Sequence, residues 1–463
     1  MTLRKVPSIP PEAWKPAVGA PGEAPRPLER FFVIAASSGV LMLGAAVVAL
    51  LWANSPWGDS YAQFWQAPIA LRFGDLVLER NLQWLINDVL MVLFFFLIGL
   101  ELRRELHQGE LSESGRAALP LAAAIGGMVG PPVLYLLIAH ASGLRAGFGV
   151  PIATDLAFAV GLLSLLGRRV PASVRVLLLA LAVLDGVGAS LAIALFYSEG
   201  VGFGGLCLAA AGLASIFMLR RLGVRPKVAY LVPALLTWAG VSMAGIHPTI
   251  AGVILGLLTP VEARLGPRGF VWRMQRELKI FERSGPDQPN NHQLPLTLRE
   301  VERTRREAMS PADSLLEPLH PLVAFGILPL FALANAGLSF RGLSLDGASA
   351  HAATGVALAL VLGKPLGVLL GCGVALRLRL ATLPSGLRAR QLALLGAVGG
   401  VGFTMPLFLA QLAFPDARVL LAAKLGILTG SALAAALALA LGLWLFPSGK
   451  GAAAPPARAL PAH

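Results

Sequence analysis

Three ionisable side chains lie in the middle of long apolar stretches of this sequence. Asp155 stands in "GVPIATDLAF", Asp185 in "LAVLDGVGAS" and Lys364 in "VLGKPLG". An ionised side chain at the centre of a bilayer costs about 2.5–3.5 kcal/mol to insert, so each of these groups needs an opposite charge, a proton or a passing ion. Such groups mark ion and proton paths in membrane proteins, and a purely structural salt bridge is the simpler alternative.

The apolar stretches around these residues are interrupted by helix breakers. Pro151 precedes Thr154 and Asp155, and "GAVGGVGFTMP" at 396–406 places several glycines in mid-span. Backbone freed in this way is tolerated only where it is buried in protein or lines a water-filled cavity. Two broken spans in separate halves of a chain indicate a transporter site with half-helix ends facing the ion. The residues of the second interruption are Gly399, Gly400, Gly402 and Thr404.

Composition places these stretches in a membrane protein. The chain has 463 residues, of which 56% are hydrophobic and 14% charged, against roughly 25% charged in soluble domains. We count about twelve apolar segments of the length that crosses a hydrocarbon core of roughly 30 Å. An even number puts both chain ends on the same side of the membrane. The segments are 31–53, 83–100, 117–139, 148–166, 174–197, 203–219, 228–245, 247–261, 319–338, 352–376, 391–413 and 419–446.

The basic residues indicate the orientation. The formal net charge is +13, and with both termini in the cytoplasm most lysines and arginines fall in the inner tails and loops. This is the positive-inside bias of membrane proteins. Because the basic residues are scattered over every inner loop, nucleic-acid binding is not expected. Residues 1–30 are proline-rich and polar, without the apolar core of a signal peptide, so we expect the first span to be retained.

The chain is expected to divide into two tails and one membrane domain. The tails at 1–30 and 447–463 have the composition of disordered cytoplasmic segments. The membrane domain at 31–446 includes a polar cytoplasmic loop at 262–318, whose second part has opposite charges at helical spacing. Residues 68–80 alternate apolar and polar about "FGD", which predicts an extracellular β-hairpin. Its edge would pair with a second copy of the chain or fold back on its own protein.

The same stretches carry a family resemblance that covers nearly all of residues 31–446. The sequence resembles the NhaA family of bacterial sodium/proton antiporters. The resemblance implies an all-α inner-membrane protein in which the fourth and eleventh of twelve spans are broken and cross. It also implies exchange of Na⁺ or Li⁺ for protons, no cofactor, lipid surroundings and dimerisation through the hairpin. The motifs, in order, are "ATDLAFAVG", "ALAVLDGVGA", "HPTIAGVILG", "HPLVAFGILPLFALANAG", "GKPLG", "GGVGFTMPLFLAQLAF" and "AKLGILTGS".

The resemblance assigns roles residue by residue. Asp155 matches the acidic residue of the broken fourth span and Thr154 its hydroxyl neighbour. Lys364 matches the lysine of the tenth span, and Asp185 the first of two adjacent aspartates in the fifth. We expect Asp185 and Lys364 to form a coupled pair. The positions linked in the family to the cytoplasmic funnel and the pH response are Asp88, Glu101, His247 and Glu317.

This chain departs from the family pattern at the second aspartate, the principal cation ligand, where it has Gly186. A step of about 100° per residue on a helix means that Asp185 cannot take its neighbour's place without turning to another face. Three outcomes follow. Antiport persists through Asp155 with weaker sodium affinity and fewer protons per cycle, the cation has changed, or the protein is a non-transporting sensor of pH or ions.

An enzyme is the competing class, because two membrane aspartates could form the dyad of an intramembrane aspartyl protease. The residues before Asp155 and Asp185 lack the glycine-rich approach expected of such a protease, and Lys364 would have no role. The sequence contains no H-E-x-x-H motif for a zinc protease. We therefore expect a transporter, without catalytic residues or a resident metal.

Overall fold

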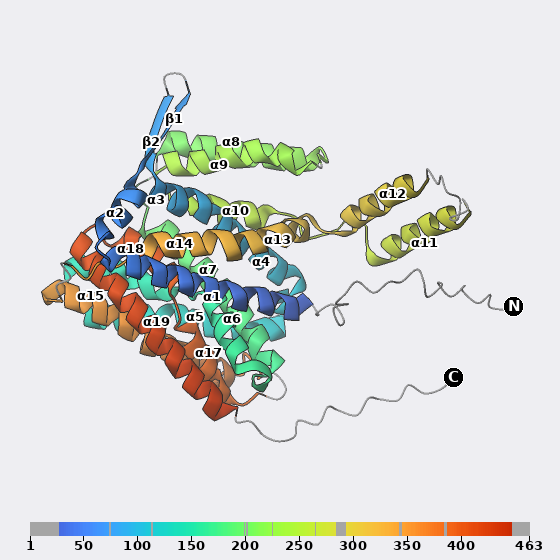
Figure 1. Ribbon diagram of the computed structural model, residues 1–463. Helices are drawn as coiled ribbons and strands as arrows, with labels where there is room; N and C mark the ends of the chain where they lie inside the picture. The colour runs from blue at the N-terminus through green and yellow to red at the C-terminus, as the bar shows by residue number, and fades with distance from the viewer. Residues whose placement is uncertain are drawn as a thin grey trace.

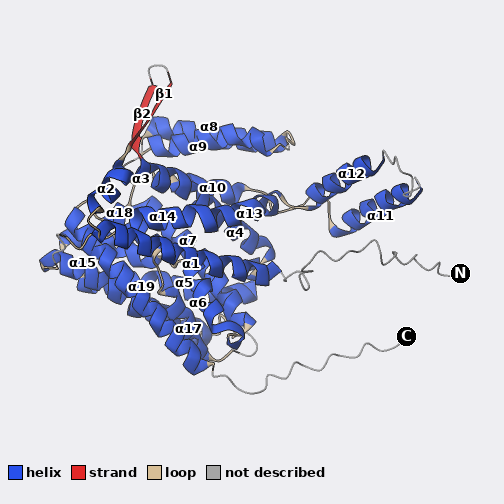
Figure 2. Cartoon of the chain, in the orientation of Figure 1, coloured by secondary structure: helices blue, strands red, loops and turns tan. Residues whose placement is uncertain are grey.

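The computed structural model describes residues 27–73, 76–112, 114–198, 200, 202–224, 226–263, 265–283, 293–341, 345–383 and 387–446. Within these residues, helices make up the structure apart from one two-stranded hairpin (Figure 2). Residues 1–26 and 447–463, which hold nearly all of the two expected tails, lie outside the described residues.

Helices are labelled α, or η where they are 3₁₀ or π helices. The first half of the chain contains α1 Pro27–Asn54, α2 Gly58–Gln66, α3 Leu82–Trp84, η2 Leu85–Leu90, α4 Met91–Gln108, η3 Glu110–Ser112, α5 Ser114–Ile138, η4 Ser142–Ile152, α6 Leu156–Leu166, η5 Gly167–Arg169, α7 Ala172–Phe196 and α8 Phe203–Arg221. The second half contains η6 Lys227–Tyr230, α9 Leu231–Met243, α10 Thr249–Leu258, α11 Pro267–Arg283, α12 Gln293–Ala308, α13 Pro311–Leu322, η7 Val323–Ile327, α14 Leu328–Asn335, α15 Gly347–Leu358, η8 Ala359–Gly363, α16 Lys364–Arg377, η9 Ala389–Gln391, α17 Leu392–Gly399, α18 Thr404–Ala413 and α19 Ala417–Leu445.

The protein is an all-α polytopic membrane protein. In the described chain, eight helices are long and apolar enough to cross a membrane, or up to ten if each of two bent pairs counts as one span. Lys227–Met243 and Thr249–Leu258 are shorter apolar helices. The bent pairs are η4 with α6, at 46°, and η9–α17 with α18, at 57°. The eight long spans are Ser37–Asn54, Leu82–Gln108, Ala117–Ile138, Ser173–Phe196, Phe203–Arg221, Pro311–Asn335, Gly347–Arg377 and Ala417–Leu445.

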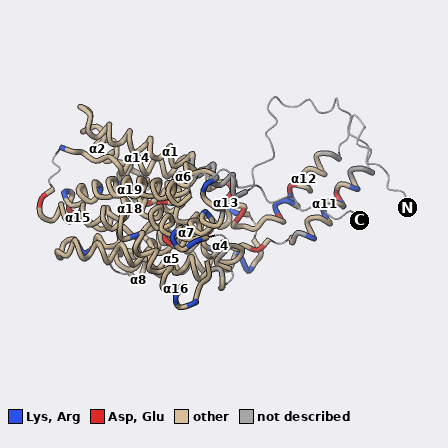
Figure 3. The backbone as a smooth tube through the Cα atoms, turned by 90° about the horizontal axis from the view of Figure 1, so that it is seen from below, with Lys and Arg blue, Asp and Glu red and all other residues tan. Residues whose placement is uncertain are grey.

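The distribution of side chains is that of a protein surrounded by lipid. Leu137, Leu165 and Trp444 are 72%, 76% and 71% exposed, whereas Lys364 is fully buried. Figure 3 shows few charged residues along the bundle and many around α11, α12 and α13. Apolar side chains therefore cover the outside, and the ionisable groups of the spans are turned inward, as a bilayer requires.

Close contact between α5 and α16 fixes the position of Lys364. A Cβ atom at Gly126 of α5 would lie 2.1 Å from the carbonyl oxygen of Gly367 in α16, and one at Gly130 would lie 2.6 Å from that of Gly363. Small residues at such crossings let membrane helices approach each other closely. The contact brings the start of α16, and with it Lys364, against the centre of the bundle.

The two ends of the bundle carry different elements. Strands β1 Pro68–Phe73 and β2 Leu76–Asn81 pair antiparallel, with Pro68 opposite Asn81 and Phe73 opposite Leu76. This hairpin stands at one end of the bundle, and α11 and α12 project from the other (Figure 1). The start of α1 and the end of α19 lie at the same end as α11 and α12 (Figure 1).

The polar loop expected at 262–318 contains two helices of its own, α11 and α12. The helix expected in its second part is confirmed as α12. The following membrane helix, α13, already begins at Pro311, because the Ser310 side chain accepts a hydrogen bond from the backbone N–H of Asp313 and caps it. The last residues of the expected loop thus belong to the next span.

We predict that Gly367→Ala destabilises the protein and that Gly373→Ala on the same helix does not. A Cβ at position 367 would lie 2.2 Å from the carbonyl oxygen of Gly126, whereas one at 373 meets nothing within 4 Å. Overpacking costs about 1–3 kcal/mol. The measurement is the unfolding temperature of the detergent-solubilised protein. Equal effects of the two substitutions would contradict the close α5–α16 contact.

Candidate functional site

The two bent spans meet at their breaks. The backbone N–H of Asp155, between η4 and α6, donates a 3.0 Å hydrogen bond to the carbonyl oxygen of Val401, between α17 and α18. Pro151 carries no N–H for a helical bond, and Phe403 adopts a φ of +38°, which an α-helix does not contain. These local features end the helices where the two chain segments contact each other.

The glycines of the second break are required by close neighbours. A Cβ at Gly400 would lie 2.4 Å from the carbonyl oxygen of Leu360, and one at Gly402 would lie 2.4 Å from Cγ of Pro406. Gly399 supplies a carbonyl oxygen to the site, as described below. The run of glycines predicted to be a broken helix therefore lets the chain pass through a crowded centre.

Asp155 is held by the N-termini of two helices. Its side chain is 3% exposed and accepts hydrogen bonds from the N–H groups of Ala157 and Phe158 at the start of α6, at 3.1 and 3.3 Å. It also accepts one from the N–H of Thr404 at the start of α18, at 3.2 Å, and another from the Thr404 hydroxyl. The positive ends of two helices thus face one buried carboxyl group.

Asp185 and Lys364 form a separate buried pair. Nζ of Lys364 lies 2.7 Å from Oδ2 of Asp185, and both side chains are fully buried. Lys364 also donates to the carbonyl oxygen of Ile152 beside the first break. Oδ1 of Asp185 has no hydrogen-bond partner among the described residues. The lysine therefore neutralises Asp185 and also holds the backbone of η4.

Thr154 connects this pair to the broken helices. Its hydroxyl oxygen lies 2.6 Å from Oδ2 of Asp185 and 2.8 Å from the carbonyl oxygen of Gly399. A hydroxyl has one hydrogen and donates to one acceptor at a time. The Thr154 hydroxyl can therefore pass from one acceptor to the other if the charge on Asp185 changes.

A cavity of about 80 Å³ reaches Asp155 from one side, which is room for several water molecules. Thr154, Thr404 and Gly186 line it near Asp155, and Glu101 lines it as well. Within the described chain, its lining contains neither Asp185 nor Lys364. The cavity thus gives access to one of the two buried aspartates only. Among the described residues, the lining consists of Ser38, Phe94, Leu97, Ile98, Glu101, Thr154, Asp155, Leu156, Ala157, Ala182, Val183, Gly186, His320, Val323, Ala324, Leu328, Thr404 and Met405.

The four residues expected in the funnel and the pH response lie in three different places. Glu101 is buried and lines the cavity, where Oε1 lies 3.1 Å from Nε2 of His320. Asp88 lies away from the cavity lining, with Oδ1 3.6 Å from Nε2 of His247. Glu317 lies on the surface.

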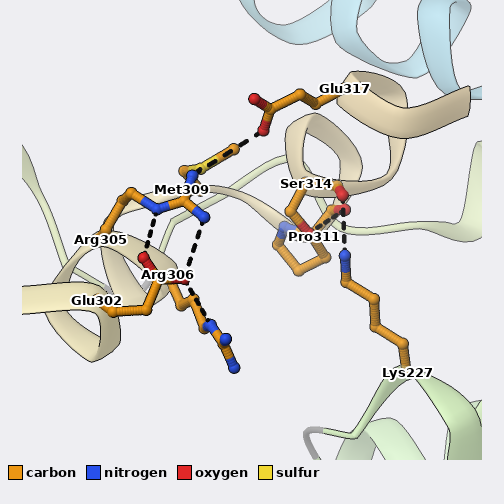
Figure 4. A network of polar contacts seen from close by, with 8 residues as sticks. All are labelled: Lys227, Glu302, Arg305, Arg306, Met309, Pro311, Ser314 and Glu317. Atoms are coloured by element: carbon orange, nitrogen blue, oxygen red, sulfur yellow. Dashed lines mark hydrogen bonds and ion pairs between the residues drawn. The ribbon is translucent and has the colours of Figure 1, made fainter. Parts of the chain in front are cut away.

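Glu317 belongs to a charged network at the junction of α12 and α13 (Figure 4). Its side chain is 66% exposed and lies 4.0 Å from Arg305. Hydrogen bonds from Arg305 and Arg306 lower the pKa of Glu302 in the same network to about 2. Because of this low pKa, Glu302 stays ionised across the physiological pH range. Lys227, in the same network, donates a 2.8 Å hydrogen bond to the carbonyl oxygen of Ser314.

Sequence reasoning missed His320 and a group of buried and half-buried amides. Nδ2 of Asn87 lies 2.7 Å from Oε1 of Gln411, and Nδ2 of Asn335 lies 2.9 Å from Oδ1 of Asn87. Gln83, just after the hairpin, donates to Asn335 at 3.1 Å. We call Gln83, Asn87, Asn335 and Gln411 the amide cluster. Its signal in the sequence was the presence of polar amides inside apolar spans.

Two broken membrane helices that meet at a buried carboxyl group are typical of a secondary transporter. The model of the family Na⁺/H⁺ antiporter 1 matches residues 29–441 of this chain. A "Na(+)/H(+) antiporter NhaA 2" of Myxococcus xanthus is 57% identical over 438 residues, which cover 95% of this chain and 93% of that protein. Proteins of the same name in Sorangium cellulosum and Pseudomonas putida are 47% and 45% identical, covering 96% and 90% of this chain and 95% and 92% of theirs. The chain belongs to the NhaA family of Na⁺/H⁺ antiporters, as its motifs predicted.

We predict that Asp185→Asn and Lys364→Gln each destabilise the protein and that the double variant is more stable than either. Each single substitution leaves one uncompensated buried charge, at a cost of about 3–5 kcal/mol, and the double variant leaves none. The measurement is the unfolding temperature in detergent, read as a double-mutant cycle. Additive losses would contradict the pairing.

Proposed function

We propose that this chain is a secondary transporter that exchanges Na⁺ or Li⁺ for protons across the bacterial inner membrane and serves pH and sodium homeostasis. The observation that carries the proposal is Asp155. It is a buried carboxyl group that lines the cavity and is held by the N-termini of two broken helices. The family match and the names of the relatives support this proposal.

Competition at Asp155 couples the two ions. A carboxylate in the membrane interior is strongly disfavoured unless it carries a proton or a cation. Na⁺ and Li⁺ are hard cations and prefer oxygen ligands. The hydroxyls of Thr154 and Thr404 lie beside Asp155 on the cavity wall, and the interrupted backbone offers carbonyl oxygens. Binding of the cation then requires loss of the proton, and binding of the proton expels the cation.

Gly186 sets the number of exchanging carboxyl groups. It lines the cavity at the position where the family pattern has an aspartate, and Asp185 is occupied by Lys364. One carboxyl group exchanges one proton for one cation. We therefore propose one proton per Na⁺, with no net charge moved in a cycle.

The interrupted backbone supplies the movement. The first break contains Pro151, and the second contains Gly399, Gly400, Gly402 and Thr404. Backbone and side-chain hydrogen bonds join these two crossed breaks. Rotation of one broken helix against the other would expose Asp155 to the two sides in turn. The Thr154 hydroxyl and Lys364 both contact Asp185 and also hydrogen-bond to the backbone at the breaks. A change in the charge of Asp185 therefore changes these backbone hydrogen bonds.

The arrangement supports twelve spans with both termini in the cytoplasm. Eight long spans, two bent pairs and two shorter apolar helices would together make twelve. The start of α1, the end of α19 and the charged helices α11 and α12 lie at one end (Figure 1), which the positive-inside rule assigns to the cytoplasm. The cavity contains Glu101 near the end of α4, and Gln108 of α4 contacts Val261 before α11. The cavity therefore faces the cytoplasm, and the amide cluster closes the outer side.

Glu101 and His320 are the groups we propose for pH control. Histidine changes its charge between pH 5 and 8. The contact between Glu101 and His320 ties α13 to α4 at the cavity. Asp88 and His247 form a second pair that joins η2 to the segment just before α10. Glu317 lies on the surface beside Arg305 and does not contact either pair.

The hairpin is proposed as a dimer contact. Strands β1 and β2 stand at the outer end of the bundle and form a two-stranded sheet. Such a sheet leaves two edges that can pair with another copy of the chain. A homodimer through residues 68–80, embedded in lipid, is the proposed assembly.

We predict that Asp155→Asn abolishes proton flux driven by Na⁺ or Li⁺ in proteoliposomes, because an amide neither binds the exchanged proton nor balances a cation. The matched control is Asp416→Asn. Asp416 also caps a helix, accepting from the N–H groups of Arg418 and Val419, but it lies outside the cavity lining. Full activity of the Asp155 variant would refute the proposed mechanism.

The same assay separates the outcomes left open by Gly186. Wild-type flux with Na⁺ or Li⁺ supports the proposed exchange. Flux with K⁺ alone shows a changed cation. Absence of cation-dependent flux in wild type identifies a sensor, and rescue of a salt-sensitive, antiporter-deficient bacterium provides the cellular readout.

We predict that Glu101→Gln shifts the pH dependence of Na⁺-driven flux, because it removes the carboxylate whose Oε1 lies 3.1 Å from Nε2 of His320 on the cavity wall. Glu317→Gln is the control and leaves the pH profile unchanged. The measurement is Na⁺-driven flux between pH 5.5 and 9. Equal shifts in the two variants would contradict the proposed role of Glu101.

A further inference from the structure

Two histidines from distant parts of the chain meet at one end of the bundle. The ring centroids of His140 and His351 lie 6.1 Å apart, with an angle of 75° between the ring planes. His140 follows α5, and His351 belongs to the first part of α15. Both residues are exposed, and α15 lies at the end of the bundle opposite α11 and α12 (Figure 1). The pair is therefore open to solvent, and it is separate from the cavity lining around Asp155.

The packing of α5 against α15 fixes the backbone that carries the two rings. A Cβ atom at Gly355 of α15 would lie 3.2 Å from Cδ2 of Tyr135 and 3.5 Å from Cβ of Ala139. Ala139 continues the last turn of α5, since its N–H donates a 2.8 Å hydrogen bond to the carbonyl oxygen of Tyr135. His140 is the next residue, and His351 lies about one helical turn before Gly355. The contact between the helices thus brings both imidazoles to the same place.

The hydrogen bond of His351 leaves one of its ring nitrogens available to a metal ion. Its Nδ1 lies 2.7 Å from the carbonyl oxygen of Gly347. Because a carbonyl oxygen only accepts, Nδ1 carries the hydrogen of the neutral ring and Nε2 keeps a free lone pair. A bond of this kind on the second nitrogen orients metal-binding histidines and makes them stronger ligands. Within the part of the chain that the structure describes, His140 has no hydrogen-bond partner that occupies its nitrogens.

The separation of the two rings fits a shared metal ion. A metal–nitrogen bond of about 2.0–2.1 Å places the centroid of an imidazole about 3.2 Å from the ion, so two rings at the tetrahedral angle have centroids about 5 Å apart. The observed 6.1 Å is longer by about 1 Å, and exposed side chains make such an adjustment by fast, small rotations. Imidazole suits Zn²⁺, Cu²⁺ and Ni²⁺, whereas Mg²⁺ and Ca²⁺ prefer oxygen ligands.

We propose that His140 and His351 bind one divalent transition-metal ion of the Zn²⁺ class, which joins the end of α5 to the start of α15. The two imidazoles supply half of a tetrahedral shell, and water completes it. An ion that binds only the folded chain stabilises it. The site is separate from the ion exchange proposed at Asp155, so the inference does not depend on the proposed function.

The test is calorimetric titration of the full chain in detergent with Zn²⁺, after purification through a tag without histidine and treatment with a chelator. It compares wild type with His140→Asn, His351→Asn and the double variant. The matched control is His107→Asn. His107 is also exposed, and its Nδ1 lies 3.0 Å from the carbonyl oxygen of Arg103, four residues earlier. In the described chain its ring contacts no second histidine.

We expect wild type and His107→Asn to bind one Zn²⁺ per chain at this site with equal affinity. His140→Asn and His351→Asn each lower the affinity at least about tenfold, because a single imidazole no longer chelates the ion. The double variant loses little more, since either substitution already breaks the chelate. Zn²⁺ raises the unfolding temperature of wild type and of the control only, and Mg²⁺ raises neither.

The inference is overturned if the zinc affinity of either His140→Asn or His351→Asn equals that of wild type, because the two rings then share no ion. An equal loss in His107→Asn also overturns it. Unfolding temperatures without metal establish that each variant is folded. A histidine-modifying reagent provides a second readout in wild type. Zn²⁺ protects His140 and His351 from the reagent and leaves His107 reactive, and a lack of protection at the pair refutes direct binding.

Discussion

The structure depends on the requirement that a charge in the membrane interior meets a partner. Three ionisable groups lie at the centre of the bundle, and the fold satisfies them in two different ways. Lys364 neutralises Asp185 within a closed pair. Asp155 receives hydrogen bonds from the N–H groups of two helix starts, which stabilise its charge without a side-chain cation. The broken helices exist because this second arrangement needs free N–H groups at the centre of the membrane.

This division gives the two aspartates different tasks. Asp155 lines a cavity and is the carboxyl group that we propose exchanges a proton for a cation, whereas Asp185 lies outside that lining and holds Lys364. Thr154 lies between them, within hydrogen-bond distance of Asp185 and of the Gly399 carbonyl oxygen. Thr154 thereby connects the backbone at the helix breaks to the buried Asp185–Lys364 pair. Gly186, which also lines the cavity, adds no charge to it.

The sequence predicted the parts of the site that follow from local chemistry. Charged residues in apolar spans located Asp155, Asp185 and Lys364, and proline and glycine in the same spans located the two breaks. The family assigned from the motifs is confirmed. The sequence did not predict His320 opposite Glu101, because a contact between α13 and α4 depends on packing between distant segments.

Other features of the site depend on contacts between distant segments and are visible only in the structure. The packing of Ile98 on Gly186 joins two helices far apart in the chain, and no spacing rule reveals it. The family resemblance linked Glu317 to the funnel and the pH response, and the structure places it on the surface beside Arg305. Glu317 and His320 are three residues apart on the same helix, yet His320 contacts Glu101 while Glu317 is exposed. Family motifs thus located the correct helix, and only the structure located the face.

The most direct test of the account is chemical modification of the two aspartates. A hydrophobic carbodiimide reacts with protonated carboxyl groups in membranes, and mass spectrometry identifies the modified residue. We expect Asp155 to be modified, Na⁺ or Li⁺ to slow this reaction, and Asp185 to stay unmodified in both conditions. Modification of Asp185 with protection by Na⁺, while Asp155 remains unreactive, would contradict the assignment of the exchanging carboxyl group.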